Sequence, residues 1–216
     1  MKPLKNNWTT WLIILAPYFF AALFWNQFPD QIPIHFNHSG EPDNYASKMV
    51  GLLLMPGINI ALYVLFTMLP KIDPSKKNYR LFQDKLKPVR AAIHTFFSLL
   101  MIMTFLYTLG YQINISLIVL YGLAALFLLI GNYLGNIRHN YFIGIRTPWT
   151  LANEQVWMKT HRFAAKLWVV CSLLIMLILP FFDTSERGIP FIIYATLLIF
   201  LPTGYSFVQF KKLSNS

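Results

Sequence analysis

The sequence predicts an all-α fold: an integral membrane bundle of six transmembrane helices, with an interfacial amphipathic helix before the fifth. Of the 216 residues, 56% are hydrophobic and only 12% are charged. A soluble domain of this length needs more charges to cover its surface. The charged residues are also unevenly spread. Five stretches contain none of them: residues 6–29, 49–70, 91–137, 167–182 and 188–210.

A transmembrane helix needs about 20 apolar residues to cross about 30 Å of hydrocarbon. Four of the charge-free stretches therefore suit one span each, and the longest suits two. No Ala-x-Ala-like cleavage site follows the first stretch, so we expect it to be retained rather than removed as a signal peptide. The first four spans are predicted at residues 8–28, 49–69, 92–109 and 113–134, the fifth ends near residue 182, and the sixth covers residues 189–210.

The placement of the basic residues predicts the orientation. Sixteen of the 18 Lys and Arg residues lie in the two termini and in the loops 70–90 and 135–166, and only Lys48 and Arg187 lie in the alternate loops. The positive-inside rule therefore places both termini and these two loops in the cytoplasm. The net charge of +10 is explained by contact with anionic lipid headgroups, and direct binding to nucleic acid is not expected.

Several local features are predicted from residue type. Proline and glycine residues should break regular structure in the outer loop 29–48, and Pro56 should kink the second helix. The basic loop 70–90 suits a short helix lying on the inner leaflet. A tight turn is expected at residues 110–114. His94 is either a hydrogen-bonded residue or a proton carrier, and Cys171 is expected to be a small core residue.

The segment after the fourth span contains more specific patterns. Gly131 and Gly135 are four residues apart, which allows a close helix contact. Asn132, Asn136 and Asn140 would form a polar seam if the helix continued, but Gly144 and Pro148 indicate that it ends earlier. A new helix is predicted to begin at Thr147-Pro148, because threonine suits the N-cap and proline the first helical position. Its apolar face is expected to contain Trp149, Ala152, Val156, Trp157 and Phe163.

Two segments carry a family resemblance. IPIHFNHSGEPDNYASK resembles the first outer loop of SdpI-type bacteriocin immunity proteins, and NYFIGIRTPWTLANEQVWMKTHRFAAKLW resembles their cytoplasmic region before the fifth span. Both occur in the expected order, so the resemblance covers essentially the whole chain. It divides the chain into residues 1–48, 49–134 and 135–216. One departure is Ala164-Ala165, where family members often carry glycine.

The resemblance implies a membrane protein without catalytic activity or cofactor that protects a bacterial cell from a secreted peptide, the sporulation-delaying toxin in the best-known case. It also implies possible signalling, in which a cytoplasmic winged-helix repressor of the ArsR type is held at the membrane. The outer-loop residues implied in toxin recognition are His35, Phe36, Asn37, Gly40 and Asp43. The inner residues implied in the motif and in docking of a regulator are Asn140, Gly144, Arg146, Trp149, Glu154, Trp157, His161 and Arg162.

The residues leave three alternatives open. His35 and His38, with Glu41 and Asp43 nearby, are suitable ligands for a divalent metal, although the spacing lacks the His-Glu-x-x-His pattern of a metalloenzyme. A small transporter would need ionisable residues inside the membrane, and the spans contain few besides His94. On the inner side, Arg146, Glu154, His161 and Arg162 suit either an ion-pair network or a docking patch.

Overall fold

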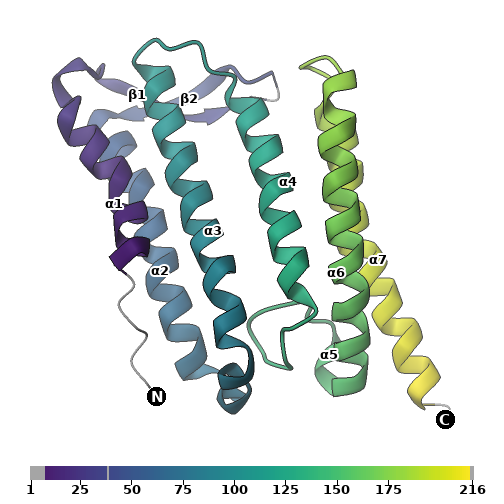
Figure 1. The fold of residues 1–216 in the computed structure, drawn as a ribbon. Coiled ribbons are helices and arrows are strands. Elements are labelled where there is room, and N and C mark those ends of the chain that lie inside the picture. The colour runs from purple at the N-terminus through teal and green to yellow at the C-terminus, as the bar shows by residue number, and fades with distance from the viewer. Residues whose placement is uncertain (1–7, 38, 215–216) are drawn as a thin grey trace. The chain divides into compact units, whose positions relative to one another are not determined.

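The computed structural model describes residues 8–37 and 39–214 (Figure 1). The chain forms two compact units. The first contains the residues up to Leu65 together with Ala91–Gly122, and the second contains Phe66–Arg90 together with Leu123–Ser216. The boundary between the units passes through three helices, α2, α3 and α4, each of which contributes residues to both.

Within residues 8–37 and 39–214, five helical segments are long and apolar enough to cross a membrane. They comprise α2 with the turn before it (Val50–Ile72), α3 (Lys76–Thr108), α4 (Ile115–Leu134), α6 with the 3-10 turn after it (Glu154–Phe181), and α7 (Gly188–Ser214). The first predicted span is shorter. Its described helix α1 covers Trp8–Leu23, 16 residues, or about 24 Å at 1.5 Å per residue, and a 3-10 turn follows at Trp25–Gln27. The count of six spans therefore stays a prediction.

The loop 29–48 was expected to be irregular, and this expectation was wrong. It forms an antiparallel hairpin of β1 (Gln31–Phe36) and β2 (Pro42–Ser47), which lies across one end of the helices of the first unit (Figure 1). Proline is tolerated here because each strand has only one paired edge. The register shifts on both sides of His35. Buried Ile32 fixes the hairpin to a cluster with Phe28, Leu52 and Phe105.

The predicted disturbance near Pro56 takes the form of a π-helical turn. Residues Val50–Leu54 form this turn, and α2 (Met55–Ile72) continues from it. The Met55 N–H donates to the Val50 carbonyl, a bond that spans one residue more than in an α-helix. Because Pro56 supplies no N–H and its ring crowds the preceding turn, a wider turn at this point accommodates it.

Helix α3 differs from its prediction. The basic loop was expected to form a separate short helix, but Lys76–Thr108 is one continuous helix of 33 residues that includes Pro88. No glycine interrupts this stretch, and the buried residues Phe82, Leu86 and Val89 continue one apolar face into the span. The turn after α3 was predicted correctly, and Gly110 supplies its positive φ of 94°.

A buried polar cluster joins three helices of the first unit. Asn59 on α2 donates to Ser98 Oγ at 2.9 Å, and its side-chain oxygen lies 2.7 Å from His94 Nδ1, with both partners on α3. Ser98 donates in turn to the carbonyl of Ile13 on α1. His94 is 1% exposed, so it takes part in packing between helices.

In the second unit, the helix predicted to start at Thr147 does start there. Thr147 caps α5 (Pro148–Ala152) and forms a capping box with Thr150. Asn153 then interrupts the helix and caps α6 (Glu154–Ile178), accepting from the N–H groups of Gln155 and Val156. The amphipathic segment is thus divided between α5 and the first turns of α6. Its position in the membrane interface stays a prediction.

Gly131 of α4 and Gly135, which follows the end of α4, make the predicted close contact with α6. A Cβ atom on Gly131 would lie 2.8 Å from the Cβ of Trp168 and 3.3 Å from the carbonyl oxygen of Ala165, and one on Gly135 would lie 3.5 Å from the Ala165 Cβ. Helix α7 also packs on α6, where Ser172 of α6 and Tyr194 of α7 are hydrogen-bonded at 2.7 Å. The helix ends early, as Gly144 and Pro148 indicated: α4 stops at Leu134, so Asn132, Asn136 and Asn140 do not form a seam along one helix.

Candidate functional site

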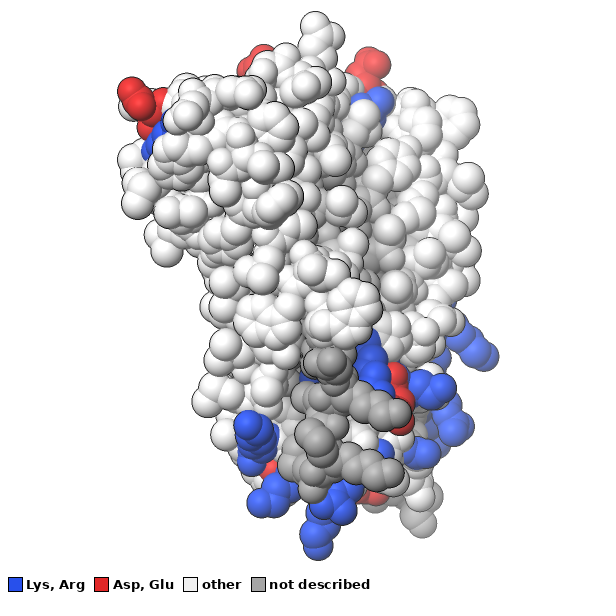
Figure 2. Space-filling view, turned by 60° about the vertical axis from the view of Figure 1, so that its left-hand side comes forward, with Lys and Arg blue, Asp and Glu red and all other residues white. Residues whose placement is uncertain are grey.

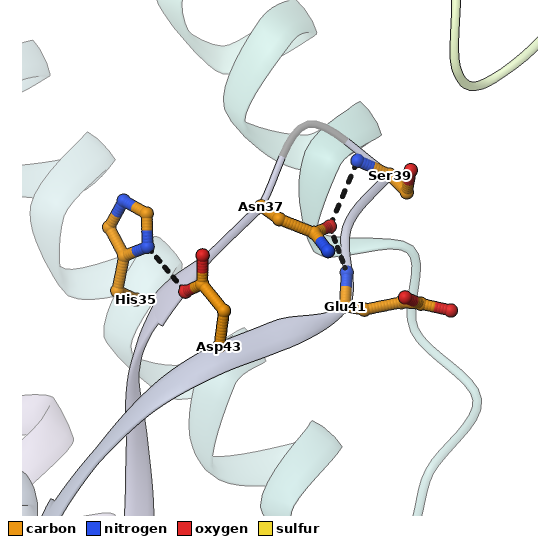
Figure 3. Close-up of polar contacts among 5 residues, drawn as sticks. All are labelled: His35, Asn37, Ser39, Glu41 and Asp43. Atoms are coloured by element: carbon orange, nitrogen blue, oxygen red, sulfur yellow. Dashed lines mark hydrogen bonds and ion pairs between the residues drawn. The ribbon is translucent and has the colours of Figure 1, made fainter.

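The turn of the hairpin β1–β2 is organised by Asn37 (Figure 3). Its side-chain oxygen accepts from the N–H groups of Ser39 and Glu41, both at 3.0 Å, and its backbone bonds to Glu41 and Gly40. Gly40 has a φ of 83°, a conformation that favours glycine. A Cβ at Gly40 would lie 3.2 Å from the Cβ of Ser116 on α4. These two predicted residues therefore shape the loop.

His35 and Asp43 face each other across the hairpin. His35 Nδ1 lies 2.5 Å from Asp43 Oδ1, and the two side chains are 64% and 44% exposed. An exposed pair of this kind contributes little to stability. Both groups therefore remain available to an external ligand.

The proposed metal ligands are not brought together as a cluster. Among the described residues, no group of three or more His, Cys, Asp and Glu side chains is placed to hold a metal ion. His38 lies outside the described residues. The metal alternative thus receives no geometric support.

A largely apolar cavity of about 390 Å³ lies beneath the hairpin within the first unit. Phe36, the remaining outer residue of the prediction, lines it and packs edge-on against Tyr107 with the ring centroids 5.3 Å apart. His35 and Asn37 of the hairpin segment also line it. The helical side of the lining is contributed by Gly51, Met55, Leu100, Met101, Thr104, Phe105, Ile115, Ser116, Val119 and Leu120.

On the inner motif, Asn140 fixes the loop that follows α4. Its side-chain NH₂ donates to the carbonyls of Arg138 and Ile143, each at 2.9 Å. Its side-chain oxygen accepts from the N–H groups of Phe142 and Ile143. Asn140 is fully buried, and these bonds use both its donor and its acceptor capacity. Its role is to hold the backbone of this loop.

His161 holds the other side of the same loop. Its Nδ1 lies 2.9 Å from the Trp157 carbonyl, and its Nε2 accepts from the N–H of Ile145 at 3.0 Å. A ring nitrogen that accepts carries no proton, so this arrangement requires the neutral imidazole. Trp157 stacks on His161 and donates to the Ile137 carbonyl. Gly144, at a φ of 116°, packs directly against the His161 ring.

The remaining inner residues lie nearer the surface. Trp149 packs on Phe207 of α7, and Arg146 donates to the Tyr141 carbonyl. Glu154 and Arg162 are exposed. Among the described residues, the ion pairs are His35–Asp43 and Lys87–Asp84, so the suggested inner ion-pair network does not form. Figure 2 shows in blue that most of the Lys and Arg side chains in view gather at one end of the helices.

Sequence reasoning missed Asp73. This carboxylate is 1% exposed and accepts from the N–H of Ser75, the N–H of Tyr141 and the hydroxyl of Tyr79. It thereby joins the start of α3 to the inner loop. The available signal was Asp73-Pro74-Ser75, because aspartate often accepts from the backbone two residues on and starts a turn.

Comparison with known proteins gives two family matches and one similar protein. Residues 136–206 match the SdpI/YfhL protein family, and residues 12–60 match a domain of unknown function, DUF1648. The chain is 30% identical over 213 residues to Immunity protein SdpI of Bacillus subtilis (strain 168), covering 99% of this chain and 100% of that protein. No solved structure matches.

Proposed function

Since this chain belongs to the SdpI/YfhL protein family, we propose that it is a multi-pass membrane immunity protein that protects a bacterial cell from a secreted antimicrobial peptide. The observation that carries the proposal is the 30% sequence identity to an immunity protein, which extends over 99% of this chain and 100% of that protein. The five candidate spans support a position in the cell membrane.

We propose that the hairpin β1–β2 is the element that meets the peptide. Exposed His35 and Asp43 offer polar contacts, and the cavity beneath them offers apolar contacts. Asp30, Glu41 and Asp43 give the loop an acidic balance, which attracts a cationic peptide. Asn37 and Gly40 act indirectly by holding the turn.

Expression in toxin-sensitive Bacillus cells that lack their own immunity gene tests the proposal. Cells with the natural chain should survive the sporulation-delaying toxin or a sibling toxin at concentrations that kill cells with an empty vector. Combined His35→Ala and Asp43→Asn changes should lower the tolerated concentration by about tenfold, because two polar contacts with a charged partner are lost.

The control is Ser185→Ala together with Glu186→Gln. Like the hairpin variant, it removes one polar side chain and one negative charge from a predicted outer loop, but it leaves the hairpin intact. It should protect as the natural chain does. Killing of cells that display the natural chain in the membrane, by every sibling toxin tried, would count against the immunity function. Equal protection by the hairpin variant would instead exclude the hairpin as the contact.

On the inner side, we propose that the exposed residues Arg146, Glu154 and Arg162 form the surface available to a cytoplasmic regulator such as an ArsR-type repressor. The support is the division of roles within the motif. Asn140, Gly144, Trp157 and His161 are occupied in holding the loop, which leaves the exposed side chains for a partner.

The alternatives have less support. A transporter needs a polar path through the membrane, whereas His94 is buried against Asn59. A metalloenzyme needs three or more ligands, and the described residues offer no such group. We therefore retain a protein without catalytic activity as the proposal.

A further inference from the structure

A second cavity lies among the basic residues of the second unit. It measures about 260 Å³ and is lined by residues of α3, of α6 and of the segment after α4. Its volume corresponds to that of about nine water molecules in the liquid, enough for a phosphate group with its ester substituents. The lining residues are Leu81, Lys85, Gly135, Asn136, Ile137, Arg138, Met158 and Arg162.

Three cations from three different segments converge on this cavity. Lys85 comes from α3, Arg138 from the segment after α4, and Arg162 from α6. Among the described residues, which include all eight acids of the chain, none forms an ion pair with these three side chains. Arg138 makes only a 3.8 Å contact with the Met158 sulfur. Two guanidinium groups, an ammonium and the Asn136 amide therefore present donors without a carboxylate to accept from them.

We propose that this cavity is a binding site for a phosphate group, and specifically for the phosphodiester of an anionic phospholipid such as phosphatidylglycerol. Arginine binds phosphate with two parallel hydrogen bonds and is the preferred residue for this recognition. The site goes beyond the immunity function, because it lies in the second unit and shares no residue with the hairpin or its cavity. Of the three residues proposed to meet a regulator, it includes Arg162.

The height of the site along the helices favours a lipid over a soluble phosphate. The charge-free part of α3 begins after Arg90, and Lys85 precedes it by about 7.5 Å along the helix axis. On α6 the charge-free part begins after Lys166, and Arg162 precedes it by about 6 Å. The headgroup layer on each side of the hydrocarbon is about 5–7.5 Å thick, so the backbone positions of these cations lie within headgroup depth.

An adjoining hollow of about 160 Å³ gives a further reason. It shares Leu81, Arg138 and Met158 with the cation-lined cavity and is also lined by Glu154. A carboxylate next to the site repels a free phosphate, which carries nearly two charges, more strongly than a phosphodiester, which carries one.

The test is native mass spectrometry of the full chain, purified in detergent and incubated with phosphatidylglycerol or with phosphatidylcholine of the same acyl chains. The natural chain should retain phosphatidylglycerol in preference. Changing Arg138→Gln and Arg162→Gln together should lower the bound fraction by about tenfold, because two charge-assisted contacts are lost.

The control variant Lys76→Gln with Lys77→Gln removes the same charge from the first turn of α3, outside the cavity, and should change binding by less than about twofold. If this control loses as much lipid as the arginine variant, or if both lipids bind equally, the proposal is overturned. If the variant Arg138→Gln with Arg162→Gln does not elute as a single species, the variant Arg138→Lys with Arg162→Lys tests the proposal in its place. A loss of about threefold in bound lipid is then expected, because lysine cannot bind phosphate through two parallel bonds.

Inorganic phosphate added to the lipid complex separates the two sources of the ligand. We expect millimolar phosphate to leave the bound lipid in place. Displacement of the lipid by inorganic phosphate alone would assign the cavity to a soluble phosphate and overturn the assignment to phospholipid.

Discussion

At the residue scale, the inner motif consists of side chains that each hold a specific piece of backbone. The Asn140 side chain donates to the carbonyl of Arg138 and accepts from the N–H of Ile143. His161 accepts from the N–H of Ile145. Buried backbone groups without partners are costly, so these bonds allow an irregular segment to pack against buried Trp157. We therefore propose that any docking of a regulator at this segment depends on the geometry of the loop as well as on its exposed charges.

Gly144 offers a test of this view. Changing Gly144→Ala should destabilise the protein by about 1–3 kcal/mol, because a positive φ is strained for any residue with a Cβ, and the added methyl group also meets the His161 ring. The measurement is thermal unfolding of the detergent-purified chain, followed by tryptophan fluorescence. Gly188→Ala is the control, because nothing lies within 4 Å of a Cβ there. Equal unfolding midpoints for both variants would contradict this account of the loop.

The sequence identified these residues only in part. The family resemblance pointed to Asn140, Gly144, Trp157 and His161, but it gave no reason for their importance, because hydrogen bonds between segments cannot be read from spacing. Asp73 was missed for a physical reason. In a loop with seven basic residues, an acid is expected to be solvated or ion-paired, yet it is buried and bonded mainly to backbone N–H groups.

At the element scale, the apolar lengths predicted most helices well, and the connections between them less well. Spans four and six lie within two residues of their predicted starts, because long charge-free stretches leave few alternatives. The hairpin was missed because its strands contain proline, which argues against strands in the middle of a sheet but not in a two-stranded one. The continuity of α3 was missed because the charged part and the apolar part were treated as separate elements.

The contact between α4 and α6 provides a prediction for the elements. Changing Gly131→Leu should destabilise the protein by about 1–3 kcal/mol, since overpacking forces neighbouring atoms to move and the nearest of these include backbone atoms of α6. Gly204→Leu on α7 is the matched control, because nothing lies within 4 Å of its Cβ position. Thermal unfolding midpoints compare the two, and a loss with Gly204→Leu equal to that with Gly131→Leu would show that glycine is not needed for the contact.

At the scale of the whole molecule, the distribution of charge predicts which segments face which side of the membrane. Three helices, α2, α3 and α4, contribute to both compact units, and the cations of α3 are confined to its first half. Lysine and arginine residues orient membrane proteins, because segments that carry them stay on the cytoplasmic side. The first half of α3 is therefore predicted to lie on that side. The predicted orientation therefore depends on the lysine and arginine residues of all the loops and termini together.

Single cysteines test this topology. In a Cys171→Ser background, Ser47→Cys and Ser185→Cys should react with a membrane-impermeant maleimide in intact cells, because both positions are exposed and lie in predicted outer loops. Gln83→Cys and Ser214→Cys, exposed but in predicted inner segments, should react only after the cells are lysed. Reaction of Gln83→Cys in intact cells would reverse the assignment of sides, and with it the proposed partners of both loops.

The alanines at positions 164 and 165 have a consequence that extends to relatives. The family resemblance implies glycine there, whereas here the glycines are Gly131 of α4 and Gly135 just after it. Ala165 lies against both of them, and Ala164 is fully buried. A close contact between two helices needs small side chains on only one of them, so the glycines can lie on either side of the contact. We therefore expect an inverse relation between side-chain size at 131 and 135 and size at 164 and 165 across homologues, so that exchanging small and larger residues between the two helices should restore a stability that either change alone removes.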